Sequence, residues 1–311
     1  EYMIIILLGN IITHLYFGMN AVLRAASKPR QAMYTTIFTV VLNSILDPLF
    51  IYTFDMGIRG AAIATILSQT VALVWQIRLF SDKGELLHLK RGIYRLDNII
   101  VKNILGIGIS PFAMNATACL VAIFVNQRLL EYGGDLAVGA FGIANRVAFI
   151  FVMINMGVNQ GMQPIAGYNY GAQKYDRLMR VLMLAMIAGT CVTTSGFIVA
   201  EFMPHLCVRL FTNDKVLTDL AVNGIRIMMA AMPIVGYQMI VTNFFQSIGK
   251  AKISIFLSLS RQLLFLVPLI GVMPLFFGVN GVWVAMPISD SFSAIFALVM
   301  MVRYMRVFKK R

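Results

Sequence analysis

The sequence is short of charge: 13% of its 311 residues are charged, while 59% are hydrophobic. A soluble domain carries about 25% charged residues, so this composition excludes an ordinary soluble globular fold. Cysteine and histidine are also scarce, with three of each. Cys119, Cys191 and Cys207 lack the spacing of a zinc site, and we interpret them as small core residues. We therefore expect no bound metal.

Long apolar runs take the place of the missing charge. Each run is about 20 residues or longer, the length at which a helix crosses roughly 30 Å of hydrocarbon. The runs do not alternate polar and apolar residues, so they predict helices rather than barrel strands. We predict an all-α polytopic membrane protein. Its predicted spans are 2–23, 31–53, 58–80, 99–128, 136–166, 178–203, 217–247, 251–275 and 281–306.

The charge that is present is mostly positive, with 26 basic and 13 acidic residues. When loops are assigned alternately to the two sides, one side collects 19 of the 26 basic residues, including the C-terminal tail. This is the positive-inside bias, and it predicts that this side, with the C-terminus, is cytoplasmic. No loop combines charge with aromatic residues as a nucleic-acid surface does, so we expect no nucleic-acid partner.

An internal repeat relates the two ends of the chain. Residues 27–69 align with residues 249–290, so that Pro48 matches Pro268. Each copy has a basic turn, a span with a late proline, a GxxG turn and a further span. Repeated halves with a cavity between them are typical of secondary transporters.

The repeat also predicts the domain organisation. Residues 1–80 form the remainder of a first lobe, 81–98 a cytoplasmic linker, and 99–311 a six-span second lobe with a basic tail. If the repeat is complete, three helices precede Glu1 and the whole protein has two lobes of six spans each. The nine spans here are then nine of twelve.

The stretch NSILDPLFI places Asp47 and Pro48 inside an apolar span. Asn43 lies one helical turn earlier, so both polar side chains point to the same face. Pro48 lacks a backbone donor and predicts a kink that frees carbonyl groups. A carboxyl group there is either a site for a proton or ion, or a structural hydrogen-bond anchor at the kink.

Arg146, Arg261 and Asp290 form a second polar group. Each lies about ten residues into its span, which puts all three near mid-depth at 1.5 Å per residue. We expect them to share a network, because an unpaired buried charge is costly. The network is either a structural clamp or part of a substrate cavity, to which we also assign Gln163.

The stretch GMQPIAGYNYGAQKYDR, residues 161–177, predicts a kinked helix end and a tight turn after the 136–166 span. Gly157 and Gly161 form a GxxxG pair, a spacing that allows close helix packing. The chain has neither a phosphate-binding loop nor a convergent catalytic set. We therefore expect no enzyme and no cofactor, and transport driven by an ion gradient.

Taken together, five stretches resemble the multidrug and toxic compound extrusion (MATE) family, in its bacterial drug-exporting branch. The resemblance implies a two-lobed, twelve-helix antiporter of a bacterial plasma (inner) membrane. It exports organic cations and amphiphilic drugs in exchange for H⁺ or Na⁺, and we expect a monomer. The five stretches are 23–33, 43–51, 57–69, 163–172 and 246–252.

The resemblance also implies a coupling-ion site formed by Tyr2, Asn43, Asp47 and Thr65. Some sodium-coupled members carry acids in their seventh and tenth helices, but spans 99–128 and 217–247 offer none at the matching positions. Sodium coupling through the second lobe is therefore not expected. The alternative is a flippase for lipid-linked oligosaccharides, for which Arg146 and Arg261 are the candidate headgroup ligands.

Overall fold

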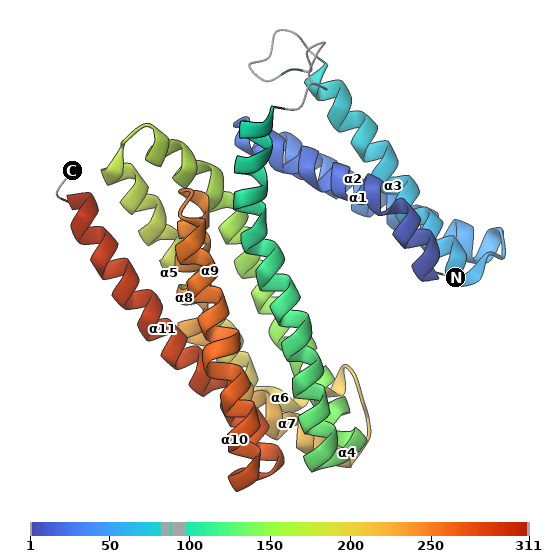
Figure 1. Ribbon diagram of the computed structural model, residues 1–311. Coiled ribbons are helices and arrows are strands. Elements are labelled where there is room, and N and C mark those ends of the chain that lie inside the picture. Colours follow the sequence, from blue (N-terminus) through green and yellow to red (C-terminus); the bar gives the residue numbers. More distant parts are fainter. Residues whose placement is uncertain (1, 82–87, 89–96, 310–311) are drawn as a thin grey trace. The chain divides into compact units, whose positions relative to one another are not determined.

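The computed structural model shows a helical protein, which confirms the all-α prediction. By internal contacts the chain divides into two compact units, Glu1–Asp97 and Asn98–Arg311, each considered by itself (Figure 1). The predicted linker 81–98 lies for the most part outside the described residues. The residues described are 2–81, 88 and 97–309.

The first unit consists of three long helices, and both α1 and α2 pack on α3. Proline begins α2, where its missing N–H is harmless because the first turn of a helix leaves its donors free. Two small apolar clusters, around Tyr16 and around Leu23, form the core. The elements are α1 (Tyr2–Ala25), α2 (Pro29–Pro48), its continuation η1 (Leu49–Thr53) and α3 (Gly57–Phe80).

Buried polar side chains join the three helices of this unit. Asn20 Nδ2 on α1 donates to the carbonyl oxygen of Ala32 on α2 at 2.9 Å. Gln76 Nε2 on α3 donates to Thr35 Oγ1 on α2 at 3.2 Å. Such bonds fix the register of apolar helices, which hydrophobic packing alone specifies poorly in lipid.

A π-helical turn adjoins each of the two repeated prolines. η1 follows Pro48, and its wider turn is visible in the bond from Phe54 N to Leu49 O at 3.1 Å. In the second copy η2 (Ser260–Leu266) directly precedes the segment that begins with Val267 and Pro268. A proline cannot donate to the α-helical ladder, and a π-turn is one way to absorb the missing bond.

The repeated GxxG turns are also built alike. A Cβ on Gly60 would lie 2.7 Å from the carbonyl oxygen of Phe50, and a Cβ on Gly281 would lie 2.4 Å from that of Met273. Both glycines let the chain pass its own preceding helix at a distance that no other residue allows. The repeat read from the sequence therefore has a structural counterpart.

The second unit begins with α4, Asn98–Gly171, which contains two predicted spans. Its 74 residues would extend about 110 Å as one helix, far more than a bilayer. The helix breaks at Gly134, whose φ of 65° and ψ of −166° are open essentially to glycine alone. Figure 1 shows the green chain doubling back at this point.

The remaining helices complete the second unit, and α8 packs against α4, α5 and α11. The predicted span 217–247 is two helices, bent by 51° at a break directly before Pro233, which lies in the first turn of α8. Asp214 caps α7 by accepting from Val216 N at 2.8 Å. The helices are α5 (Tyr175–Phe202), α6 (Pro204–Arg209), α7 (Lys215–Met229), α8 (Met232–Ser247), α9 (Ala251–Leu259), α10 (Val267–Phe277) and α11 (Val279–Lys309).

The stretch 161–177 holds a helix end and a tight turn, as predicted: α4 ends at Gly171, and the turn that follows includes Gln173 with φ of 56°. Pro164 lies inside α4 and does not end it. The pair Gly157 and Gly161 faces open space and makes no close contact. Spacing alone indicates that two glycines share a helix face, but not that another helix lies against it.

Close packing occurs instead between α5 and α8. A Cβ on Gly236 would lie 2.6 Å from the carbonyl oxygen of Gly189 and 2.2 Å from Thr193 Oγ1. In lipid, small residues of this kind let two helices gain contact area without a hydrophobic driving force.

Seven helices among the described residues are long and apolar enough to span a membrane, or eight if the bent pair α7–α8 counts as one span. α4 is one of the seven and holds two predicted spans, so the elements account for all nine. Large apolar side chains such as Leu8, Tyr52, Phe202 and Leu275 are more than half exposed. Exposed apolar surface on helices of this length faces lipid.

Candidate functional site

The first candidate site lies where α2 and α3 meet, one turn before η1. Asn43 Nδ2 donates to Asp47 Oδ1 at 3.1 Å and lies 3.5 Å from Thr65 Oγ1 on α3. Thr65 Oγ1 in turn donates to the carbonyl oxygen of Ala61 at 2.9 Å. All three predicted side chains are half-buried. An amide donor thus holds one carboxylate oxygen of Asp47, and the protein covers these side chains only in part.

Tyr2, the fourth residue assigned to this site, makes no hydrogen bond to the other three within the described residues. It occupies the first turn of α1 with 37% of its surface exposed. The structure therefore brings together Asn43, Asp47 and Thr65, and the assignment of Tyr2 stays a prediction.

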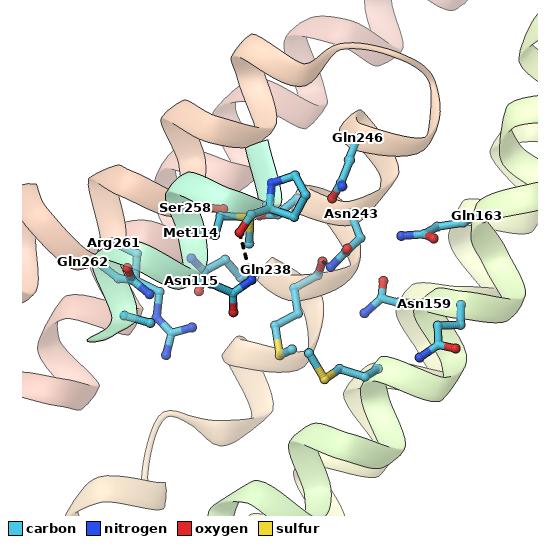
Figure 2. A pocket seen from close by; sticks show the side chains of 16 residues that line it. Met114, Asn115, Asn159, Gln163, Gln238, Asn243, Gln246, Ser258, Arg261 and Gln262 are labelled. Atoms are coloured by element: carbon cyan, nitrogen blue, oxygen red, sulfur yellow. Dashed lines mark hydrogen bonds between the residues drawn. The ribbon is translucent and has the colours of Figure 1, made fainter. Parts of the chain in front are cut away.

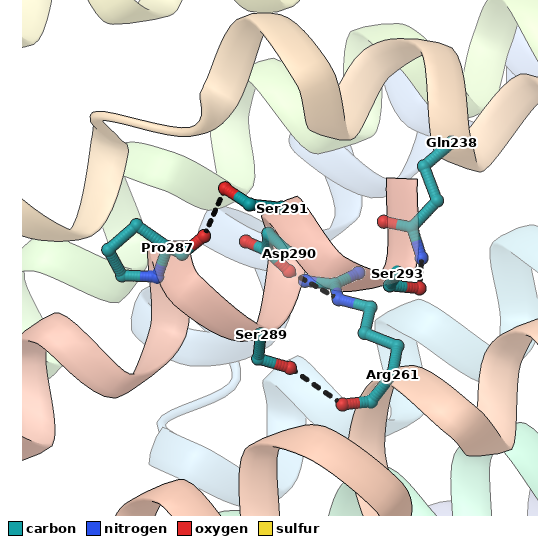
Figure 3. Close-up of polar contacts among 7 residues, drawn as sticks. All are labelled: Gln238, Arg261, Pro287, Ser289, Asp290, Ser291 and Ser293. Atoms are coloured by element: carbon teal, nitrogen blue, oxygen red, sulfur yellow. Dashed lines mark hydrogen bonds and ion pairs between the residues drawn. The ribbon is translucent and has the colours of Figure 1, made fainter. Parts of the chain in front are cut away.

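The second candidate site is in the second unit, where Arg261 Nε contacts Asp290 Oδ1 at 2.7 Å (Figure 3). Asp290 is 8% exposed, so the carboxylate depends on this partner. The neighbouring Ser289 Oγ donates to the carbonyl oxygen of Arg261 at 2.7 Å. Gln238 Nε2 donates to Ser293 Oγ one turn further along α11. These contacts tie α11 to η2 and α8.

Arg146 does not join this network, and the expectation that it would was wrong. Its side chain is exposed, and its guanidinium carbon lies 6.0 Å from the ring centre of Phe211. The reason is direction: equal depth along two helices does not bring their side chains to the same face. Cation–π contact replaces the expected carboxylate partner.

A cavity of about 380 Å³ lies beside the Arg261–Asp290 pair, within the second unit (Figure 2). Both segments of α4 line it, together with α8, α9 and η2. Eight of its 16 lining residues are asparagine or glutamine, and Gln163 is among them, as expected. In Figure 2 Asn159 and Gln163 extend from α4 toward Asn243 on α8.

Sequence reasoning missed most of this amide lining, although a signal was present. Gln238, Thr242 and Gln246 recur every fourth residue along the otherwise apolar α8, which places them on one face. Asn159 and Gln163 have the same spacing on α4. No group of three His, Cys, Asp or Glu that could bind a metal occurs in the part of the chain that the structure describes.

Nine apolar spans, a carboxyl group beside a proline and a π-turn, and a polar cavity within the second unit define a multi-pass membrane protein. Comparison with known proteins gives the family: the MatE model matches residues 107–270, and the chain belongs to this family of MATE transporters. That match covers more than half of the chain.

Curated relatives match along most of the chain. The multidrug export protein MepA of Staphylococcus aureus strain N315 is 26% identical over 284 residues, which are 91% of this chain and 62% of the relative. MepA of Staphylococcus saprophyticus is 24% identical over 284 residues, with the same coverage. The chain thus spans 62% of the length of the curated relatives it matches.

Solved structures confirm the fold. A MATE family transporter of the MOP superfamily in an outward-facing conformation has a TM-score of 0.94 at 23% identity, over 100% of this chain and 70% of that one. A MATE protein in a straight conformation scores 0.93 at 23% identity, and one in a bent conformation 0.90 at 22%. The straight form is covered over 70% of its chain and the bent form over 69%.

Proposed function

We propose that this protein is a secondary active multidrug exporter that expels organic cations and amphiphiles in exchange for H⁺ or Na⁺. The observation that carries the proposal is the half-buried carboxyl group of Asp47, bonded to Asn43 and placed directly before the π-turn η1. The relatives named multidrug export proteins support it. In this proposal the chain lies in a bacterial plasma (inner) membrane, acts as a monomer, and has a cytoplasmic C-terminus.

Asp47 is the group that takes up and releases the coupling ion in this scheme. Asn43 donates to its ionised form, and a bond to a charged acceptor is roughly twice as strong as a neutral one. Uptake of a proton or Na⁺ weakens that bond beside Pro48, where the helix already departs from α-geometry. Such a change drives transport only if the ion binds two conformations with different affinity. In this scheme the two conformations differ at the π-turn that follows Pro48.

The test is Asp47→Asn, which keeps the side-chain shape but cannot ionise. We expect it to abolish ethidium efflux from cells while the protein still reaches the membrane. Asp55→Asn is the matched control, because Asp55 is exposed just beyond η1 and its φ of 52° suits asparagine as well. Export of ethidium by Asp47→Asn cells at the parental rate would show that Asp47 has no coupling role.

The flippase alternative requires several cations in one cavity to bind an anionic headgroup. Arg261 is paired with Asp290, and Arg146 lies on Phe211 away from the cavity. The described residues therefore favour drug export.

A further inference from the structure

A groove of about 370 Å³ lies between the start of α5 and the end of α11 in the second unit. One apolar cluster joins these two helix ends to the end of α8. Figure 1 shows the start of α5 and the end of α11 at the same end of the unit. The described lining of the groove consists of two arginines, one aspartate and four methionines. It therefore combines charged groups with an apolar surface.

The charged part of the groove belongs to the first two turns of α5. Arg177 and Arg180 are three residues apart, so both project from one face of the helix. Both are exposed, and no ion pair within the described residues uses either guanidinium group. Asp176 is in the first turn of α5, where the positive end of a helix stabilises a carboxylate. Two guanidinium groups and one carboxylate leave this end of the groove with one net positive charge, which favours an anion.

The methionines continue the groove along the membrane-spanning part of the helices. From Arg177 to Met186 the helix rises about 14 Å, which leads from the end of α5 into the apolar span. Met183 lies between them and is 60% exposed, whereas Met186 and Met305 are half-buried. Methionine side chains are flexible and adapt to irregular apolar partners. This part of the groove therefore fits a hydrocarbon chain.

A phospholipid with net negative charge satisfies both parts of the groove. Arginine binds phosphate oxygens through two parallel N–H groups, and an acyl chain covers the methionines. A free phosphate would leave the methionines uncovered. Basic pockets between spanning helices on the cytoplasmic side bind anionic headgroups in other membrane proteins. In the proposed orientation the groove opens on that side, and the sequence after Met305 adds four basic residues.

We propose that this groove is a binding site for an anionic phospholipid, with Arg177 and Arg180 holding the phosphate group and the methionines lying along an acyl chain. The site goes beyond the proposed export function and does not depend on it. Lipid binding is measured without transport, so Asp47→Asn protein should bind the lipid as the parent does.

Two lipids with the same acyl chains test the proposal. Phosphatidylglycerol and phosphatidylcholine both carry a phosphodiester, but the choline cation cancels the charge of the second. Native mass spectrometry of the detergent-purified protein measures the affinity for the first bound molecule of each. We expect phosphatidylglycerol to bind about 5-fold more tightly, the effect of about one unit charge at a basic membrane-facing surface. Soluble glycerophosphoglycerol, which lacks the chains, should not displace it at equal concentration.

Substitutions should change this affinity in opposite directions. Arg180→Gln should weaken phosphatidylglycerol binding about 5-fold, and the double variant with Arg177→Gln about 20-fold. Asp176→Asn removes the acid of the groove and should tighten binding about 2- to 5-fold. Arg303→Gln is the matched control, because it removes one exposed charge near the end of α11, outside the groove. Its affinity should stay within about 2-fold of the parent's.

Three results would overturn the proposal. Equal affinity of the parent for the two lipids would show that net charge is not recognised. An equal loss in Arg303→Gln and Arg180→Gln would show a general effect of charge instead of a site. Displacement by glycerophosphoglycerol would show a site for the phosphate group alone. If the double variant does not fold, Asp176→Asn still decides, because unfolding does not raise an affinity.

Discussion

At the scale of single residues, the two members of the Arg261–Asp290 ion pair differ in their exposure to solvent. The carboxyl side chain of Asp290 is 10% exposed, whereas the side chain of Arg261 is 35% exposed. A long arginine can turn its charged end toward water when it loses its partner, but a short buried carboxylate cannot. The two residues of one ion pair therefore differ in what their removal leaves behind.

We predict that Arg261→Met destabilises the protein more than Asp290→Asn does. The first leaves a buried carboxylate without a partner, which typically costs about 3–5 kcal/mol. The second leaves a guanidinium that can reach solvent. Thermal unfolding of the detergent-purified proteins measures the difference. The double variant should recover part of the loss, and equal unfolding temperatures for the two single variants would contradict this reading.

Site residues could be predicted together from the sequence where they are close in the chain, and not where they come from distant helices. Asn43 and Asp47 share a helix face because they are four residues apart, and that spacing is local information. Arg146 lies as far along its helix as Arg261 and Asp290 do, but its side chain points toward Phe211 instead of toward them. Tertiary packing decides that direction, and the local sequence does not show it. The amide cavity draws its residues from helices far apart in the sequence. No local pattern brings such residues together.

At the scale of elements, the contact between α5 and α8 depends on Gly236. We predict that Gly236→Ala destabilises the second unit by about 1–3 kcal/mol, because the added methyl meets Thr193 and the backbone of Gly189. Gly271→Ala is the control: it lies in α10 with nothing within 4 Å of the new Cβ, and alanine favours a helix. Unfolding in detergent compares them. A neutral Gly236→Ala would show that the two helices can separate freely.

Elements were predicted well where length and hydropathy decide them. Nine apolar runs correspond to helices, since in lipid a helix is the structure that satisfies its own backbone. Their ends and bends were harder. Pro164 sits inside α4 without ending it, whereas Pro233 accompanies a 51° bend. The response of a helix to proline is set by neighbours that replace the lost bond, and the sequence does not show those neighbours.

At the scale of the whole molecule, the proposed orientation places α6 on the non-cytoplasmic side. We predict that Cys207 is labelled in intact cells by a membrane-impermeant maleimide, in a protein with Cys119 and Cys191 replaced by serine. The control is a cysteine that replaces Ser81, an exposed residue at the C-terminal end of α3. It should be labelled only after the cells are lysed. The reverse pattern would invert the orientation.

The same reaction carries a pH signature. Burial raises the pKa of the Cys207 thiol above its ordinary value, so the reactive thiolate is scarce at neutral pH. The labelling rate should rise about 10-fold per pH unit between about pH 7 and pH 9, without levelling off.

The reversal at Gly134 has a consequence for how the chain enters the bilayer. Hardly any loop separates the two segments of α4. The first segment therefore cannot cross the bilayer and remain there before the second segment has been synthesised. The two segments must be inserted as one hairpin, whose tip carries Arg128 and Glu131 across the hydrocarbon. In the folded protein these two are joined at 2.8 Å, so they form a neutral pair, and Asp135 beside Gly134 is the third charge at the tip.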